Sequence, residues 1–319
     1  MKFKKLITFL FLIILISGLQ GNGLNASEKN FNPGPFPESQ FLEVDNINYH
    51  YRLWEPAEEI RGKVLLLHGF AGSTYSWRNN VKDLKDAGYQ VIALDLPGFG
   101  YTERVKGLNH SQLQQAKRIW NLLAKLESEE IIEQNKDWHL IGHSYGGGTA
   151  AATAYYNQSR VNSLILIAGA LNVEERFDTV LLEIEPLQQL AKPLIRNILF
   201  SEPVFARLLA FIYGENILDH DLEMLIKPLQ IPGTEDVLID IASTFQDLPE
   251  SKFTDIDLPI LLIWGEEDKS ISTPPEEGQR LYDIHDNAKL VYIEKASHFP
   301  MESHPDRVNS ILIDWLNTK

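Results

Sequence analysis

The sequence of 319 residues contains no cysteine. Disulfide bonds are therefore excluded, and so is a lipid anchor on an N-terminal cysteine. A chain of this length can bury a large hydrophobic core. Its stability must come from that core rather than from covalent cross-links.

Positive charge is also scarce. The chain has 29 Lys and Arg residues against 44 Asp and Glu residues, which gives a formal net charge of −15. Nucleic-acid binding needs clustered basic side chains to face the phosphates, so a nucleic-acid partner is not expected. The same excess of negative charge argues against adsorption to an anionic membrane.

Long apolar runs are missing except at the N-terminus. The basic start MKFKK is followed by the apolar residues 6–19, a run shorter than the ~20 residues that a spanning helix needs. This pattern is typical of a secretory signal. We therefore expect residues 1–26 to be a signal peptide, cleaved after Gly23 or Ala26, and the protein to be exported, periplasmic or secreted, by a bacterium. After cleavage no stable membrane span is expected; an uncleaved N-terminal anchor is the alternative.

Beyond residue 62 the sequence alternates between short apolar runs and segments of helical character. The apolar runs include GKVLLLHGF, YQVIALDLPG, WHLIGHS, VNSLILIAG, LPILLIWGEED and AKLVYIEKASH. Strands that are apolar on both faces occur in parallel sheets covered by helices on each side. Helices are expected at 77–87, 111–127, 146–156 and 306–317. The sequence therefore predicts an α/β fold with a doubly wound, mostly parallel sheet.

Two segments depart from this alternation. FLEVDNINYHYRLWEP alternates apolar and polar residues on either side of its central Asp-Asn pair, which predicts an antiparallel hairpin. Residues 171–257 are helical in character and too long for a crossover loop. We expect them to form an inserted helical cap, with residues 27–170 and 258–319 as the two parts of the core. Surface helices without a role at the substrate are the alternative.

The stretch WHLIGHSYGGG places one serine between two glycines, after an apolar strand and before a helix. In this G-x-S-x-G pattern, Gly142 and Gly146 lack the Cβ atoms that a tight strand-to-helix turn cannot accommodate. Ser144 would then project from the sheet at a helix N-terminus, where backbone N–H groups favour a developing oxyanion. A phosphate-binding loop would need Lys-Ser or Lys-Thr after the glycines, which this stretch lacks. The pattern favours Ser144 as a nucleophile.

A serine nucleophile needs a base, and the base needs a group that orients it. His298 lies just past the last predicted strand, at the carboxyl edge where open α/β sheets place their sites. His68 is expected to shape its own loop, and His143 to point away from the serine. The strand before the last one ends in WGEEDKS, which offers three candidate acids, Glu266, Glu267 and Asp268. A turn of this kind is normally solvated, so at least two of the three are expected to be solvated.

Five motifs occur in the order and spacing of the α/β-hydrolase superfamily. They are LLLHGFAGSTYSW, ALDLPGFGYTE, IGHSYGGG, IWGEED and ASHFPMESHP. The chain resembles this superfamily over residues 62–318 apart from the cap. By this resemblance Ser144 corresponds to the nucleophile, Asp268 to the acid and His298 to the base. The oxyanion hole would be formed by two backbone N–H groups, those of Phe70 and Tyr145.

Within the superfamily the chain looks like the branch that contains haloperoxidase-like esterases, carbon–carbon bond hydrolases, epoxide hydrolases and haloalkane dehalogenases. The last two carry Asp as nucleophile, so Ser144 points to acyl transfer through an acyl-enzyme. The resemblance implies a serine hydrolase that uses no cofactor and no metal.

The apolar stretch FARLLAFIY in the predicted cap suggests a small-molecule substrate, an ester with an apolar acyl or alcohol group. A carboxylesterase or lipase-like activity is therefore expected. Hydrolysis of a vinylogous diketone at a carbon–carbon bond, of a lactone or of an amide would use the same residues and stays open. A non-catalytic ligand-binding role on the same fold is a further alternative, and no oligomeric state is predicted.

Overall fold

The computed structural model describes residues 35–171, 192–193, 195–199, 201–213, 219–270 and 272–319. The predicted signal peptide lies outside the described residues, as does the start of the predicted cap, residues 172–191. Within the described ranges, no helix has the length and apolar character that crossing a membrane requires.

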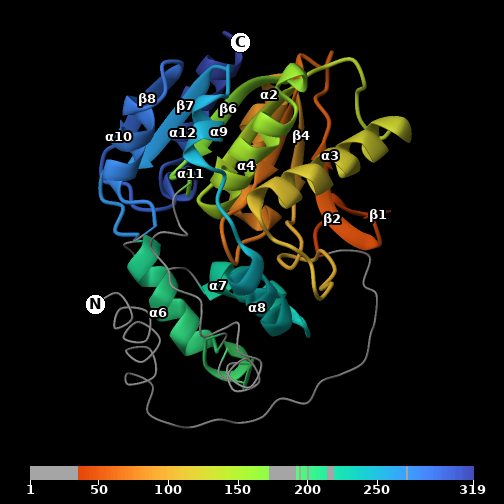
Figure 1. Cartoon of the computed structure of the whole chain (residues 1–319), viewed down its shortest axis with the longest axis vertical. Coiled ribbons are helices and arrows are strands. Elements are labelled where there is room, and N and C mark those ends of the chain that lie inside the picture. The colour runs from red at the N-terminus through yellow and green to blue at the C-terminus, as the bar shows by residue number, and fades with distance from the viewer. Residues whose placement is uncertain (1–34, 172–191, 194, 200, 214–218, 271) are drawn as a thin grey trace.

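An eight-stranded sheet forms the centre of the fold, in the order β1-β2-β4-β3-β5-β6-β7-β8 (Figure 1). The strands are β1 (Ser39–Val44), β2 (Ile47–Trp54), β3 (Gly62–Leu67), β4 (Tyr89–Leu94), β5 (Trp138–His143), β6 (Val161–Ile167), β7 (Ile260–Gly265) and β8 (Ala288–Ile293). β2 is antiparallel to both β1 and β4, whereas every other neighbouring pair is parallel. The predicted doubly wound, mostly parallel sheet is confirmed.

The β1–β2 hairpin turns at the predicted Asp-Asn pair. Asp45 and Asn46 have positive φ values of 53° and 60°, and Val44 pairs with Ile47 across the turn. Asp and Asn tolerate this left-handed backbone better than other non-glycine residues, which suits them to a two-residue hairpin loop. The hairpin stands at one edge of the sheet and leaves the parallel strands to form its centre.

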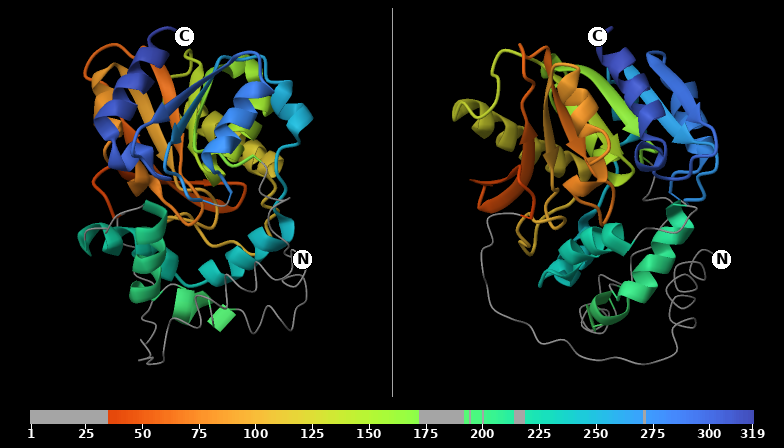
Figure 2. Two further views of the ribbon diagram at one scale, coloured as in Figure 1. Left: turned by 90° about the vertical axis from the view of Figure 1, so that its left-hand side faces the viewer. Right: turned by 180° about the vertical axis from the view of Figure 1, so that it is seen from behind.

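Helices cover both faces of the sheet (Figure 2). One face packs against α3 (Gln112–Ser128), α4 (Tyr145–Tyr156) and α10 (Pro275–Asp283), and the other against α2 (Val81–Asp86) and α12 (Pro305–Leu316). Apart from Asn162, every residue of β3 to β7 is buried, which is why these strands are continuous apolar runs. The helix expected at 77–87 is divided, because a 3₁₀ turn (η1, Thr74–Trp77) capped by the Ser73 hydroxyl precedes α2.

Between β6 and β7 the described chain is helical. Its elements are η5 (Ile195–Leu199), α6 (Glu202–Tyr213), α7 (Asp219–Ile226), η6 (Lys227–Gln230), α8 (Thr234–Thr244) and α9 (Glu250–Thr254). We refer to α6, α7, η6 and α8 as the cap; they lie beyond one end of the sheet (Figure 1). α6 and α7 share a small apolar cluster that includes Phe205, Leu209, Leu222, Leu225 and Ile226. Two apolar residues further along, Leu248 and Phe253, pack into the core against the sheet.

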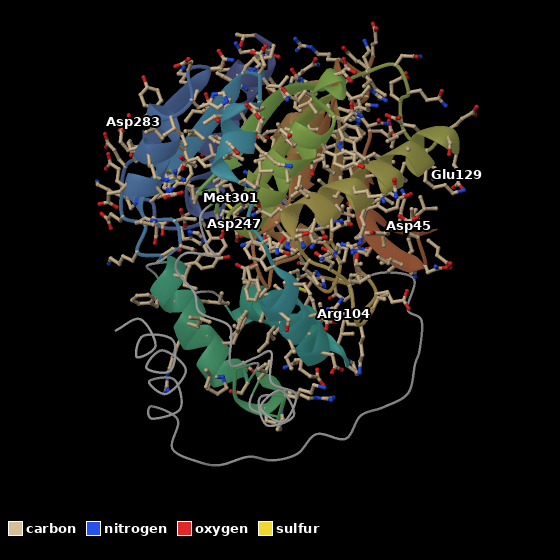
Figure 3. The ribbon with its side chains drawn as sticks, in the orientation of Figure 1. Asp45, Arg104, Glu129, Asp247, Asp283 and Met301 are labelled. Carbon is tan, nitrogen blue, oxygen red and sulfur yellow. The ribbon has the colours of Figure 1, made fainter. Side chains whose placement is uncertain are left out.

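Arg104 joins the cap to the core (Figure 3). Its guanidinium donates to Pro228 O at 2.6 Å and to Thr234 Oγ1 at 3.0 Å in the cap. On the core side it donates to three carbonyl oxygens of the loop after β4, those of Phe99, Gly100 and Thr102. Burial lowers the pKa of Arg104 to about 10, so the group still carries its charge near neutral pH. Arg104 thus ties the cap to the carboxyl edge of the sheet.

Candidate active site

Ser144 lies on the sharp turn between β5 and α4. Its backbone has φ 50° and ψ −119°, which residues with a side chain rarely adopt. A Cβ on Gly142 would lie 2.2 Å from the carbonyl oxygen of Gly146, and one on Gly146 would lie 2.4 Å from the carbonyl oxygens of Leu67 and His68. Both glycines of the motif are therefore required by close backbone contacts. Strain of this kind is concentrated at functional sites.

The backbone of Ser144 is fixed by the end of the neighbouring strand β6 and by the loop that follows it. Ser144 N donates to Ile167 O at 3.0 Å, and Ala170 N donates to Ser144 O at 2.9 Å. The residue is 8% exposed and directly precedes α4. A helix N-terminus carries partial positive charge from its unpaired N–H groups. The serine hydroxyl is thus held where negative charge on a reacting oxygen would be stabilised.

The loop after β3 packs against the serine. A Cβ on Gly69 would lie 3.3 Å from Ser144 Cβ. His68 Nε2 accepts from Leu96 N at 3.0 Å, so Nδ1 carries the proton and donates to Gly69 O at 2.8 Å. Burial lowers the pKa of His68 and keeps the ring neutral. His68 therefore holds this loop in place beside the nucleophile.

Phe70 and Tyr145, the two residues predicted for the oxyanion hole, follow Gly69 and Ser144 directly. Their rings lie 6.2 Å apart, and each stands edge-on to the ring of Phe99, at 5.3 and 6.0 Å. The Phe245 ring lies 5.5 Å from that of Tyr145. Phe70 is 53% exposed. Four rings from four segments, Phe70, Phe99, Tyr145 and Phe245, thus form an aromatic wall beside Ser144.

The structure brings Asp268 and His298 together. Asp268 Oδ2 lies 2.9 Å from His298 Nδ1, and both side chains are buried. Glu266 and Glu267, the other two acids of the cluster, are exposed to solvent. Burial and direct contact therefore single out Asp268 as the partner of His298. A carboxylate on Nδ1 leaves Nε2 of the imidazole free to act on a substrate or nucleophile.

His143 links the nucleophile turn to the loop that carries His298. Its Nε2 lies 2.9 Å from the carbonyl oxygen of His298, and because a carbonyl only accepts, Nε2 carries the proton. Burial lowers the pKa of His143 well below its usual range, so the ring is neutral. Ser144 and His298 both belong to the described part of the chain, and no hydrogen bond joins the Ser144 hydroxyl to the His298 ring. The distance between a nucleophile and its base is often long in a free enzyme and shortens in the enzyme–substrate complex.

Two further contacts at the acid were not predicted from the sequence. Ser270 N donates to Asp268 Oδ1 at 2.8 Å. Thr273 Oγ1 lies 3.4 Å from Asp268 Oδ2 and 3.2 Å from His298 Nδ1. Thr273 is fully buried, so it helps to fix both side chains. Nothing in the motif IWGEED marks it, because it lies in the loop beyond.

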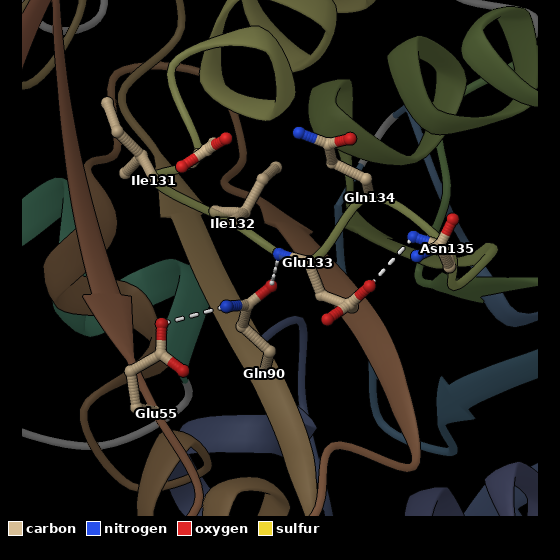
Figure 4. A pocket seen from close by; sticks show the side chains of 8 residues that line it. Glu55, Gln90, Ile131, Ile132, Glu133, Gln134 and Asn135 are labelled. Carbon is tan, nitrogen blue, oxygen red and sulfur yellow. Dashed lines mark hydrogen bonds between the residues drawn. The ribbon is translucent and has the colours of Figure 1, made fainter.

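A polar pocket opens at the opposite edge of the sheet (Figure 4). It is lined by Glu55, Gln90 and residues 130–135. Gln90 stands at the start of β4, whereas Ser144 follows the end of β5, so the pocket is remote from the site. Gln90 Nε2 donates to Glu55 Oε1 at 2.8 Å, and Gln90 Oε1 accepts from Glu133 N at 3.0 Å. In the described part of the chain, no group of three or more His, Asp or Glu side chains is placed to hold a metal ion.

The chain is similar in sequence to known proteins that are named as hydrolases. The chain is 25% identical over 279 residues to "Uncharacterized hydrolase YugF" of Bacillus subtilis, which covers 86% of this chain and 96% of that protein. It is 29% identical over 268 residues to 2-hydroxy-6-oxononadienedioate/2-hydroxy-6-oxononatrienedioate hydrolase 1 of Dechloromonas aromatica, covering 79% of this chain and 86% of that one.

A solved structure of a serine hydrolase involved in carbazole degradation shares the fold. Its TM-score is 0.70 at 19% identity, over 88% of this chain and 99% of that chain. The sequence model of the "Alpha/beta hydrolase family" matches residues 64–311, most of the chain. The protein therefore belongs to the alpha/beta hydrolase family and is a hydrolase.

Proposed function

We propose that the protein is a serine hydrolase that cleaves carboxylic esters with an apolar acyl or alcohol group. The observation that carries the proposal is the strained Ser144 beside the buried Asp268–His298 pair, whose loop His143 ties to the nucleophile turn. A serine on such a turn, with a carboxylate-oriented histidine at the same edge, has the parts that acyl transfer requires.

Acylation follows from these positions. His298 Nε2 takes the proton of the Ser144 hydroxyl while Asp268 holds the proton on Nδ1 and stabilises the imidazolium. Ser144 Oγ attacks the carbonyl carbon of the ester. The carbonyl oxygen becomes an oxyanion, which accepts hydrogen bonds from the backbone N–H groups of Phe70 and Tyr145. Each such donor contributes on the order of 3 kcal/mol to the transition state. The intermediate collapses, and the alcohol leaves with the proton from His298.

Deacylation reverses the proton transfers with water in place of the alcohol. His298 takes a proton from water, and the resulting hydroxide attacks the acyl carbon. The bond between that carbon and Ser144 Oγ then breaks, and His298 returns the proton to Oγ. The acid is released, and the enzyme regains its starting state. No redox change or other reactant is needed.

The aromatic wall favours a substrate that carries an apolar group. Phe70, Phe99, Tyr145 and Phe245 lie beside the nucleophile, and the Phe70 ring is more than half exposed. Burying an exposed aromatic face against an acyl or alcohol chain is favourable, at about 25 cal/mol per Å² removed from water.

Carbon–carbon bond hydrolysis of a vinylogous diketone is the second candidate. It is favoured by the similarity to the Dechloromonas aromatica relative, which is named as a 2-hydroxy-6-oxononadienedioate/2-hydroxy-6-oxononatrienedioate hydrolase. The same serine, acid and histidine would serve that reaction, so geometry at these three residues does not separate the two.

A substrate comparison separates them. The protein is assayed on p-nitrophenyl esters from acetate to laurate and on a 2-hydroxy-6-oxodienedioate, with Ser144→Ala measured in parallel. We expect turnover of the esters, an optimum at a medium or long acyl chain, and no turnover by Ser144→Ala. Turnover of the dienedioate without turnover of any ester would replace the ester proposal with the second candidate. Silence on both, together with failure to react with a fluorophosphonate, would favour a non-catalytic binding protein.

A further inference from the structure

The last two residues of cap helix α6 contact the chain on both sides of His298. Ser297 Oγ donates to the carbonyl oxygen of Ile212 at 2.8 Å. After His298, the Phe299 ring stacks on the Tyr213 ring, with centroids 4.0 Å apart and planes inclined by 13°. The cap therefore brackets the histidine that we propose as the base.

Tyr213 lies against charged groups that fix the cap to the core. Arg78 Nη1 donates to Glu302 Oε2 at 2.6 Å, and Arg78 Nε lies 3.5 Å from Asp221 Oδ1 of α7. Tyr75 OH donates to the same Asp221 oxygen at 2.6 Å. Burial, and next the charge of Glu302, raise the pKa of Tyr213 well above its usual range, so the phenol stays neutral. These bonds join α7 of the cap to the core, and Glu302, which accepts from Arg78, lies in α11 (Pro300–Ser303) directly after the loop of His298.

We propose that Tyr213 is a positioning residue for His298. Through its stack on Phe299 it holds the loop of the base in register with Ser144, so the base is aligned only while the cap is seated. The inference rests on the proposed function, because it assigns a role toward the proposed base. The core holds this loop at the carbonyl of His298, through His143, and the cap holds the flanking side chain.

The stack matters because proton transfer depends steeply on position. A misplacement of about 1 Å in a catalytic group can cost about 100-fold in rate. Within the core, this loop is held by His143 at the carbonyl of His298 and by Asp268 and Thr273 at its ring. The Tyr213–Phe299 stack adds a contact from the cap to the next side chain. Loss of the stack should therefore lower the rate of chemistry and leave substrate affinity nearly unchanged.

The test uses the whole protein with three variants. Tyr213→Leu removes the flat ring, Tyr213→Phe keeps it without the hydroxyl, and Tyr156→Leu makes the same Tyr-to-Leu change on the far end of α4, where the side chain is half exposed. Three quantities are measured: the second-order rate constant for labelling by a fluorophosphonate, and kcat and KM on an ester that the wild type hydrolyses.

We expect Tyr213→Leu to lower both the labelling rate constant and kcat by about 10-fold to 100-fold with KM within about twofold of wild type. Tyr213→Phe and Tyr156→Leu should stay within about twofold. The inference would be overturned if Tyr213→Leu were labelled at the wild-type rate, or if this variant raised KM and left kcat unchanged. It would also be overturned if Tyr213→Phe lost as much activity as Tyr213→Leu. If Tyr213→Leu does not fold, Ser297→Ala takes its place, because it loses the hydrogen bond to Ile212 of the cap. This variant must then show the same loss of kcat, and a wild-type kcat would overturn the inference. A wild-type protein that neither hydrolyses nor labels would contradict the proposed function instead.

Discussion

The imidazole of His143 donates from Nε2 to the main-chain carbonyl oxygen of His298 at 2.9 Å. The residue before the nucleophile therefore supports the loop that carries the base. The two ring centroids lie 4.7 Å apart. Because His143 is buried and neutral, this contact stays in place at the pH where the base works.

Replacing His143 tests whether this contact matters. His143→Leu leaves the buried carbonyl of His298 without a donor, which should destabilise the fold by about 1–3 kcal/mol and lower kcat. His143→Gln keeps a side-chain N–H donor and should recover much of both. Urea unfolding and ester kinetics measure the two effects. Equal behaviour of the Leu and Gln variants would show that the ring fills space only.

Asp268 and its exposed neighbour offer a matched pair. Asp268→Asn keeps the shape but removes the charge that holds the His298 tautomer, so kcat should fall about 10⁴-fold. Glu267→Gln makes the same kind of change on an exposed side chain and should leave kcat unchanged. Ester kinetics of both variants give the comparison. Comparable activity of the two variants would rule out Asp268 as the orienting acid.

The glycines of the nucleophile turn should not tolerate a methyl group. A Cβ on Gly142 would lie 2.2 Å from a backbone oxygen that cannot rotate away. We expect Gly142→Ala to lose several kcal/mol of stability, beyond the ~1–3 kcal/mol of ordinary overpacking. Gly107→Ala has nothing within 4 Å of the new Cβ, and its φ of +76° should cost about 1 kcal/mol. Denaturant unfolding of the two variants checks the difference, and equal losses would contradict the clash.

His139 on β5 should make the fold sensitive to acid. Burial lowers its pKa to about 4, below the ~6.5 of an unfolded chain. Between these two values the unfolded chain binds the proton and the folded one does not, so stability falls as the pH falls from ~6.5 to ~4. From pH 7 to pH 5 the wild type should therefore lose about 1–2 kcal/mol more than His139→Gln. Urea unfolding at both pH values gives this double difference, and a difference near zero would mean that His139 titrates normally.

The strands and the nucleophile could be predicted because local physics marks them. β3 to β7 are shielded on both faces, and that burial requires continuous apolar runs. Ser144 is marked by Gly142 and Gly146, since the tight turn excludes a Cβ at each. These runs still contain buried polar residues: Lys63 of β3, for example, is fully buried, and its Nζ donates to Glu127 and to the carbonyl oxygen of residue 133.

The contacts that complete the site could not be predicted, because they join segments far apart in the chain. His143 meets His298, Thr273 meets the same histidine, and Tyr213 stacks on Phe299. Each of these side chains has an ordinary local sequence, and only the folded arrangement brings it to the site. Contacts of this kind depend on the packing of whole elements, which no short pattern encodes.

The most direct test of the account is to locate the covalent adduct of a fluorophosphonate by tandem mass spectrometry of the digested protein. We expect a single stoichiometric adduct on Ser144, formed by the wild type and absent from Ser144→Ala. Labelling at another residue, or undiminished labelling of Ser144→Ala, would contradict Ser144 as the nucleophile of this hydrolase.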